Sequence, residues 1–215
     1  MRRALPLLTL LACAAPDASE ATMPDPGPGP TCTSLFDFSD PGDRAAWAAQ
    51  NDTVMGGNSD GTVVETDASI VFVGDLVTRG GGFVQVQAPL PEGALDGMTA
   101  LRLVGTSEGR PWRARVTTDE RVPRAAMRGP DVPIPNSGKG LDGPRISFAA
   151  PIEGLPQDTP GKATARFDAP DPSVRGRPVP NAAWNPGDAR TLGLILADGR
   201  DAPFRLEVLR IEVCR

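Results

Sequence analysis

Short segments in which apolar and polar residues alternate recur along this chain of 215 residues, and they constrain its fold more than any other feature. The alternating or continuously apolar segments are residues 69–76, 83–87, 101–103, 112–116, 191–197 and 204–208. Alternation indicates half-buried strands, because successive strand side chains point to opposite faces, and the continuous run at 191–197 indicates a central strand. The 24 glycines and 24 prolines supply turns. The expected fold is all-β, a β-sandwich or jelly roll with one short N-terminal helix.

The start of the folded domain predicts a strand followed by that helix. Residues 35–38 are the strand candidate. Asp40 followed by Pro41 is typical of a helix start, with aspartate as the N-cap and proline at the first helical position. We expect the helix to end before Asn51 and to carry Trp47 on its buried side. Trp112 is expected in the core as well.

Three features predict how the later segments run. The apolar positions are 204, 206 and 208, and then 209, 211 and 213, so the parity changes within one segment. Such a change predicts a β-bulge or a switch of sheet. The turn formers at 198–201 predict a hairpin connection between the last two strands. Residues 120–144 are rich in proline and glycine without a periodic pattern, which predicts a long surface loop.

The N-terminus has the character of an export signal. Arg2 and Arg3 precede an apolar run over residues 4–12, which is too short to cross a bilayer as a helix. The run ends in Leu-Leu-Ala followed by Cys13, which resembles a bacterial lipobox whose cysteine is acylated. We expect a lipoprotein signal peptide at 1–12, lipid on Cys13 and a disordered tether over 13–31. The protein would then be membrane-anchored and face the periplasm or the cell exterior. The alternative is a soluble secreted protein cleaved near Ala15.

The remaining cysteines, Cys32 and Cys214, lie at the two ends of the single domain expected over residues 32–215. An even pair in an oxidising compartment indicates a disulfide, which would join the first strand to the last. Two unrelated thiols are the alternative.

Composition narrows the class of function. The formal net charge is −5, which disfavours nucleic-acid binding, since that needs a basic patch. The chain contains no histidine, so the usual general base and the commonest metal ligand are missing. No spacing of carboxylates, serines or lysines indicates a catalytic site. We therefore expect no enzyme activity, no cofactor and no metal.

One loop combines turn formers, two adjacent glycines and a short apolar pair. It reads Asn51-Asp52-Thr53-Val54-Met55-Gly56-Gly57-Asn58-Ser59-Asp60-Gly61. Its glycines indicate either a positive φ or a close approach of backbone. Its polar side chains fit two roles, capping of nearby backbone amides or contact with a ligand. The candidate binding residues in this loop are Asn51, Asp52, Thr53, Met55, Gly56, Gly57 and Ser59.

Further candidates lie towards the C-terminus. Trp184 stands in a proline-rich segment and is a candidate for an exposed stacking platform. Arg175 and Arg177 are candidates for gripping a carboxylate or phosphate, with a plain surface loop as the alternative. Asp198 and Asp201 fit a solvated turn better than a Ca²⁺ site.

These blocks together resemble the complex I intermediate-associated protein 30 family. The family carries a Trp and then Asn-Asp-Thr-Val-Met-Gly-Gly-x-Ser-x-Gly, here Trp47 and residues 51–61. The other matching blocks are Phe-Val-Gly at 72–74, Gly-Gly-Phe at 81–83, Arg-Gly-Arg-Pro-Val-Pro at 175–180 and the closing segment 192–207. The resemblance covers about residues 35–213. It implies a galactose-binding-like jelly roll, a fold shared with carbohydrate-binding modules, and a non-catalytic role in assembling respiratory complex I.

The functional expectation is a non-catalytic binding module of the cell envelope that resembles these assembly-factor domains. The alternative is a carbohydrate-binding module. Its partner would accordingly be an envelope protein or a glycan, with the membrane reached through the N-terminal lipid.

Overall fold

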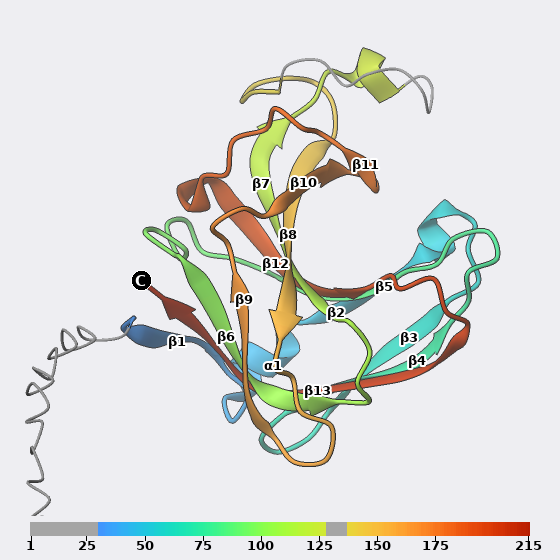
Figure 1. The fold of residues 1–215 in the computed structure, drawn as a ribbon, viewed down its shortest axis with the longest axis vertical. Helices are drawn as coiled ribbons and strands as arrows, with labels where there is room; N and C mark the ends of the chain where they lie inside the picture. Colours follow the sequence, from blue (N-terminus) through green and yellow to red (C-terminus); the bar gives the residue numbers. More distant parts are fainter. Residues whose placement is uncertain (1–29, 128–136) are drawn as a thin grey trace, which may run out of the picture.

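The computed structural model describes residues 30–127 and 137–215, and these build a 13-stranded antiparallel sheet that folds over into two facing layers (Figure 1). We call the layers the first and the second sheet, and they are joined where the end of β8 pairs with β9. The first sheet contains β1 (Cys32–Asp37), β3 (Asp60–Glu65), β4 (Ile70–Leu76), β6 (Ala100–Ser107), β9 (Gly161–Arg166) and β13 (Ala202–Cys214). The second contains β2 (Ala48–Asn51), β5 (Val84–Pro89), β7 (Arg113–Arg121), β8 (Arg145–Glu153), β10 (Asp171–Val174), β11 (Arg177–Pro178) and β12 (Ala189–Leu196). The all-β sandwich expected from the alternating segments is confirmed.

The core lies between the sheets and takes one face of each alternating strand. Val84 and Val86 of β5 pair in register with Leu196 and Leu194 of β12, and all four side chains are buried. Strand β12 lies between β5 and β7, as its continuous apolar run predicted. The opposite faces of these strands are left for a second surface, which is where the candidate site lies.

Strand β13 confirms two further predictions. Its pairing with β6 shifts between Val208 and Arg210, which is the bulge that the parity change predicted. The bulge lets both apolar sets of one long strand reach the core. At its end Cys214 pairs in register with Cys32 of β1, and the two form a disulfide.

The expected N-terminal helix is present and contains five residues. Helix α1 (Pro41–Ala45) has Asp40 as its N-cap, whose side chain accepts a hydrogen bond of 2.7 Å from the Gly42 amide. Trp47 is buried as expected but follows the helix rather than lying on it. Residues 48–51 then pair with β5 as the edge strand β2.

The connection at residues 198–201 is not a hairpin. Strands β12 and β13 belong to different sheets, so this turn carries the chain from one sheet to the other. The expected loop at 120–144 is partly structured, because β7 continues to Arg121, and η2 (Arg124–Met127) and a bridge between Arg121 and Gly138 follow. Another short 3₁₀ segment, η3 (Pro186–Asp188), leads into β12.

The expected signal peptide, Cys13 and the tether up to residue 29 lie outside the described residues. Within the described residues, no helix has the length and apolar character needed to cross a membrane.

Candidate functional site

A groove of about 960 Å³ lies on the concave face of the second sheet, on the side away from the core. Its lining residues come from the strands of this sheet, from β10–β11 and from the segment that carries η1 (Asp52–Met55), and β10–β11 lies in the upper right of Figure 1. Its floor is formed by Gln50, Arg113, Arg115, Ala149 and Ile195. Its rim includes Met55, Phe83, Asp171, Arg175 and Pro178.

The floor follows from the same alternation that builds the core. In β7 the side chains of Ala114 and Val116 point inward, so Arg113 and Arg115 point into the groove. Arg115 lies opposite Gly193 of β12 on one side and Ala149 of β8 on the other. Because both neighbours are small, the guanidinium of Arg115 is not covered by side chains from the adjacent strands.

A chain of amides holds Arg115 in place. Its Nη1 donates a hydrogen bond of 2.9 Å to Oε1 of Gln85, which is almost completely buried. Gln85 in turn donates through Nε2 to Oε1 of Gln87 at 2.6 Å and to Oε1 of Gln50 at 3.4 Å. The Gln85 side chain crosses above Gly193, where an added Cβ would lie 3.1 Å from its carboxamide carbon. The glycine therefore gives Gln85 room to reach Arg115.

The rim contributes one ion pair and one strained arginine. Arg113 pairs with Asp171 of β10 and also donates to the Ala149 carbonyl oxygen at 2.9 Å. Arg175 has a φ of 49°, in the left-handed region that non-glycine residues rarely adopt. It lies between the main groove and a smaller hollow of about 380 Å³ that Arg121 and Arg124 also line.

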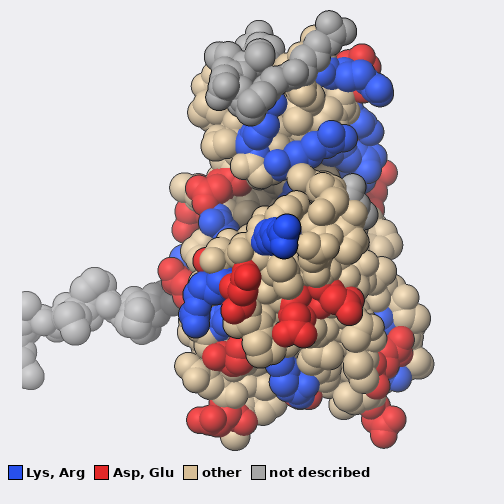
Figure 2. All heavy atoms as spheres, turned by 90° about the vertical axis from the view of Figure 1, so that its right-hand side faces the viewer, with Lys and Arg blue, Asp and Glu red and all other residues tan. Residues whose placement is uncertain are grey.

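Charge is unevenly distributed around the groove. Figure 2 views the molecule from the side to which the groove opens. Basic side chains gather in the upper part, around the ends of β7, β8 and β10, whereas acidic side chains lie mostly in the lower part. An acidic protein thus presents basic side chains beside this groove.

The loop at 51–61 is organised around the carboxylate of Asp52, which is completely buried. That carboxylate accepts hydrogen bonds from the amide and hydroxyl of Ser59 at 2.9 and 2.8 Å and from the Gly82 amide at 2.6 Å. Burial alone would raise the pKa of Asp52, but the bonds from Gly82, Ser59 and Phe83 outweigh it and hold the pKa below its ordinary value. Asp52 and Ser59 are therefore accounted for as internal partners that join the loop to residues 81–83.

The two glycines of this loop have different roles. Gly56 has a φ of 88° and ends η1, so it supplies the positive φ. Gly57 has no positive φ, but a Cβ there would lie 2.2 Å from Cγ of Asp52. Gly81 approaches the same carboxylate just as closely from the other side. The Gly-Gly-Phe block therefore belongs to the same cluster as the loop.

Of the other candidates in the loop, Asn51 stabilises the loop, whereas Thr53 and Met55 are exposed. Asn51 donates through Nδ2 to the Gly61 carbonyl oxygen at 3.0 Å and so closes the base of the loop. Thr53 is exposed and Met55 is 59% exposed, and Met55 also lines the groove. Of the loop candidates, Met55 is the one placed at the groove.

Trp184 does not stand as an open platform. Its ring packs at 5.1 Å, centroid to centroid, from both Phe148 and Phe167, and it contacts both apolar clusters of the core. Arg177 donates through Nη1 to the Ala126 carbonyl oxygen at 3.2 Å. Trp184 and Arg177 thus lie away from the groove floor, and a binding role for them stays a prediction.

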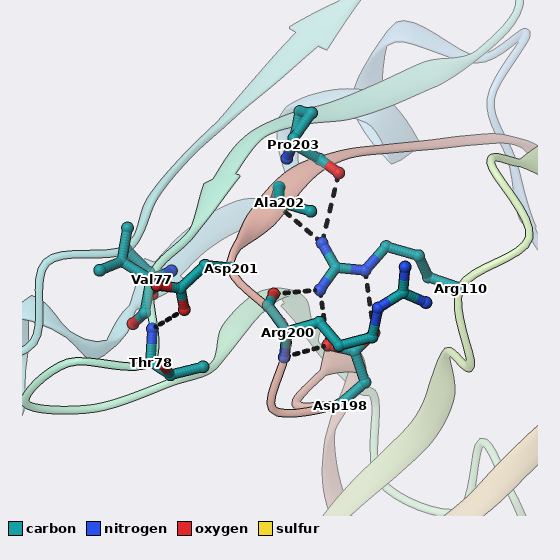
Figure 3. A network of polar contacts seen from close by, with 9 residues as sticks. Val77, Thr78, Arg110, Asp198, Arg200, Asp201, Ala202 and Pro203 are labelled. Carbon is teal, nitrogen blue, oxygen red and sulfur yellow. Dashed lines mark hydrogen bonds and ion pairs between the residues drawn. The ribbon is translucent and has the colours of Figure 1, made fainter.

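The aspartates of the turn at 198–201 are used inside the protein. Arg110 donates from Nε and Nη2 to the two carboxylate oxygens of Asp198, at 2.9 and 2.5 Å, and both side chains are 5% exposed (Figure 3). This hydrogen bonding holds the pKa of Asp198 below its ordinary value, despite burial. Asp201 accepts from the Thr78 amide at 2.8 Å, and the hydrogen bonds from the side chain and the amide of Thr78 lower its pKa. Neither carboxylate therefore points to a Ca²⁺ site, and the described residues contain no cluster of three or more metal-ligating side chains.

Sequence reasoning did not single out Gln50, Gln85, Arg113, Arg115 or Ile195. The available signal was the polar half of the alternation at 112–116, where two arginines share one face of a strand whose other face is apolar. A lone polar face is ordinary for a half-exposed strand. The strand order β5–β12–β7 was needed to bring Gln85 beside Arg115.

Comparison with known proteins assigns the fold and the family. The sequence profile described as "Complex I intermediate-associated protein 30" matches residues 36–208. Among curated proteins, none matches the sequence significantly.

Two solved structures share the fold. One is the family 11 carbohydrate-binding module of the cellulosomal cellulase Lic26A-Cel5E of Clostridium thermocellum, with a TM-score of 0.55 and 11% identity, covering 86% of this chain and 95% of that one. The other is a family 11 module from Clostridium thermocellum in complex with a β-1,3-1,4-mixed-linked tetrasaccharide, with a TM-score of 0.52 and 13% identity, covering 85% and 94%. At these identities the likeness establishes the jelly-roll architecture alone.

Proposed function

This chain belongs to the complex I intermediate-associated protein 30 family, and we propose that it is a non-catalytic binding module that takes a glycan chain in its concave groove. The observation that carries the proposal is the groove itself. It has about 960 Å³ of space, the size range of small-molecule and oligomer sites, and it is open along the sheet.

The lining of the groove suits a sugar chain. Gln50, Arg113 and Arg115 present planar groups with several donors and acceptors, which match vicinal hydroxyls. Ile195, Phe83 and the prolines of the rim supply apolar surface for the C–H faces of sugar rings. The backbone of the floor is already paired in the ladder between β12 and its neighbours, so recognition falls to side chains.

The same lining supports a non-catalytic role. Hydrolysis of a glycosidic bond commonly needs two carboxylates on either side of the bond. Among the described residues that line the groove, Asp171 is the one acidic side chain, and Arg113 already neutralises it. Binding without turnover is the function that this arrangement favours.

Filling the groove tests the proposal. Ala149→Trp places a large ring on the floor, and Val64→Trp places the same ring on the exposed outer surface of β3, where Val64 is 48% exposed. Affinity electrophoresis against soluble polysaccharides, including mixed-linked β-glucan, should show retardation of wild type and Val64→Trp but not of Ala149→Trp. Equal retardation of all three, or none for wild type with any polysaccharide, would contradict the proposal.

A protein partner is the second candidate, and Met55 favours it. This side chain is 59% exposed beside the groove, and methionine adapts well to protein surfaces. Crosslinking from Met55→Cys with a short thiol-directed reagent in envelope membranes would identify such a partner. A crosslinked protein that Ala149→Trp abolishes, without any polysaccharide binding, would favour an assembly role over glycan binding.

We also propose that the module acts in the cell envelope, anchored through lipid on Cys13. The support is the sequence alone, an apolar run that ends in Leu-Leu-Ala-Cys after two arginines. Cys13→Ala should abolish metabolic acyl labelling and leave an unprocessed precursor. Equal labelling of variant and wild type would refute the anchor without affecting the groove.

A further inference from the structure

The cations of the groove are not matched by anions of the protein. The charged residues that line it are Arg113, Arg115, Asp171 and Arg175. Asp171 is committed to Arg113, which leaves two arginines. Within residues 30–127 and 137–215, neither Arg115 nor Arg175 makes an ion pair with a carboxylate.

Arg115 is the more informative of the two because it is partly buried. Among the residues that the structure describes, its side-chain partner is the neutral amide of Gln85. Burial lowers the pKa of its guanidinium below the ordinary value, which expresses the cost of holding a cation away from water without a counter-charge. Arginine nonetheless remains charged at neutral pH. The floor thus holds a positive charge whose hydrogen-bonding capacity is largely unused.

The surroundings keep that charge open and fixed. Ala149 flanks Arg115 on β8 with a small side chain, and the space above Gly193 on β12 is occupied by Gln85, which accepts the hydrogen bond from Arg115. The amide chain through Gln85 and Gln87 orients the guanidinium before any ligand arrives. A preorganised planar donor in a concave site is suited to bidentate recognition of a planar anion.

Building on the glycan-binding role proposed above, on which this assignment rests, we propose that the groove selects an acidic glycan and seats a uronate carboxylate on Arg115. Arg175 at the rim, which also lines the smaller hollow with Arg121 and Arg124, attracts the next acidic residue of the same chain. An acidic peptide fits less well, because β7, which carries Arg115, is paired with a neighbouring strand on both sides and offers no free backbone groups for strand addition.

The test measures binding of the full chain by affinity electrophoresis and calorimetry to four probes. They are polygalacturonate, dextran sulfate, neutral mixed-linked β-glucan and polyglutamate. Arg115→Gln removes the charge but keeps a side chain that can bond to Gln85. Arg166→Gln removes an exposed charge from β9 on the other sheet and is the matched control. Thermal melting of each variant checks that it is folded.

Wild type and Arg166→Gln should bind polygalacturonate more tightly than neutral β-glucan. Arg115→Gln should weaken polygalacturonate binding by about tenfold or more, the size expected for loss of a charge-assisted pair, and leave weak β-glucan binding unchanged. Arg115→Lys should restore the charge but not the planar fork, and so recover only part of the affinity.

The other outcomes separate the two proposals. Binding of β-glucan as tight as that of polygalacturonate overturns the uronate assignment and leaves glycan binding standing. Dextran sulfate as tight as polygalacturonate, with equal loss in Arg115→Gln and Arg166→Gln, shows general electrostatic attraction and also overturns it. No polysaccharide bound at all overturns both, and polyglutamate bound alone replaces both with peptide recognition.

Discussion

Arg110 lies just before strand β7 and Arg115 lies within it, yet the two side chains have opposite electrostatic surroundings. Arg110 is 5% exposed and donates to both oxygens of Asp198 and to the carbonyl oxygens of Arg200, Ala202 and Pro203 (Figure 3). Arg115 lies in the groove and donates to one neutral amide. The first cation is paired with a carboxylate of the protein, whereas the second has no carboxylate partner among residues 30–127 and 137–215.

This difference separates structural charges from functional ones. Arg110 joins the segment before β7 to the turn that carries the chain from β12 to β13, so it fixes the crossing between the two sheets. Asp52 does the same for the loop at 51–61 by bonding to residues 59 and 82. In both places each partner is internal. Arg115 in the groove, by contrast, makes no ion pair with a carboxylate of the described residues.

The largest effect on stability is expected from Arg110→Gln. This change leaves the buried carboxylate of Asp198 without its cation, and we expect the free energy of unfolding to fall by about 3–5 kcal/mol. Arg115→Gln removes a charge that has no anionic partner and should change the same quantity by less than about 1 kcal/mol. Urea denaturation measures both.

The double variant Arg110→Gln with Asp198→Asn is the control, because it removes both charges together. It should recover part of the loss. Arg110→Gln and Arg115→Gln with equal effects on stability would show that the two arginines are not different in kind.

Asp52→Ala extends the comparison to the loop. The amides of Ser59 and Gly82 would lose a buried acceptor, and we expect a loss of about 3 kcal/mol in the free energy of unfolding. Asp60→Ala, at an exposed position of the same loop, should have little effect. Ligand binding per folded molecule should be retained in both. Unchanged melting together with lost binding would instead place the binding site at the loop.

Gly57→Ala should cost less, about 1–3 kcal/mol. The new methyl group would lie against Cγ of Asp52, so the loop or the carboxylate must move. Gly199→Ala is a useful contrast. Its φ is 72° but its Cβ would meet nothing within 4 Å, so it reports the cost of backbone strain alone. Thermal melting of the two variants compares a close approach with a positive φ.

Local pattern foresaw the elements of the fold but not their arrangement. The parity change at residue 208 identified the bulge of β13, and the Asp-Pro pair identified the start of α1, because both signals are contained within a few residues. The turn at 198–201 misled, since its residue types serve a hairpin and a sheet crossing equally well. Arg110, far away in sequence, holds the crossing in place.

The groove was harder to foresee for the same reason. The loop at 51–61 has the most distinctive sequence, yet the side chains of Asn51, Asp52 and Ser59 make hydrogen bonds within the loop itself. Arg115 and Gln85 become a site only when β12 places them on one face, with a glycine between them. Distinctive residues in a sequence often mark demanding backbone geometry, and a ligand-binding surface can be assembled from ordinary ones.

The smallest effect is expected from pH, and it distinguishes the internal carboxylates from the groove. Asp52 and Asp198 have pKa values below the ordinary 3.8 in the folded state. A carboxyl group with a lowered folded pKa stabilises the fold above its unfolded pKa, and that stability is lost as pH falls through the folded pKa. Stability should therefore be flat from pH 7 to about 5 with respect to these groups and decline below about 4.

Asp198→Asn should start less stable at pH 7 and decline less on acidification, because its side chain does not titrate. Arg115→Gln should decline in parallel with wild type, since its guanidinium stays charged throughout this range. Urea denaturation from pH 7 to pH 3 measures all three proteins, and an Arg115→Gln curve that is flatter than wild type would show that a carboxylate of the protein is coupled to Arg115 after all.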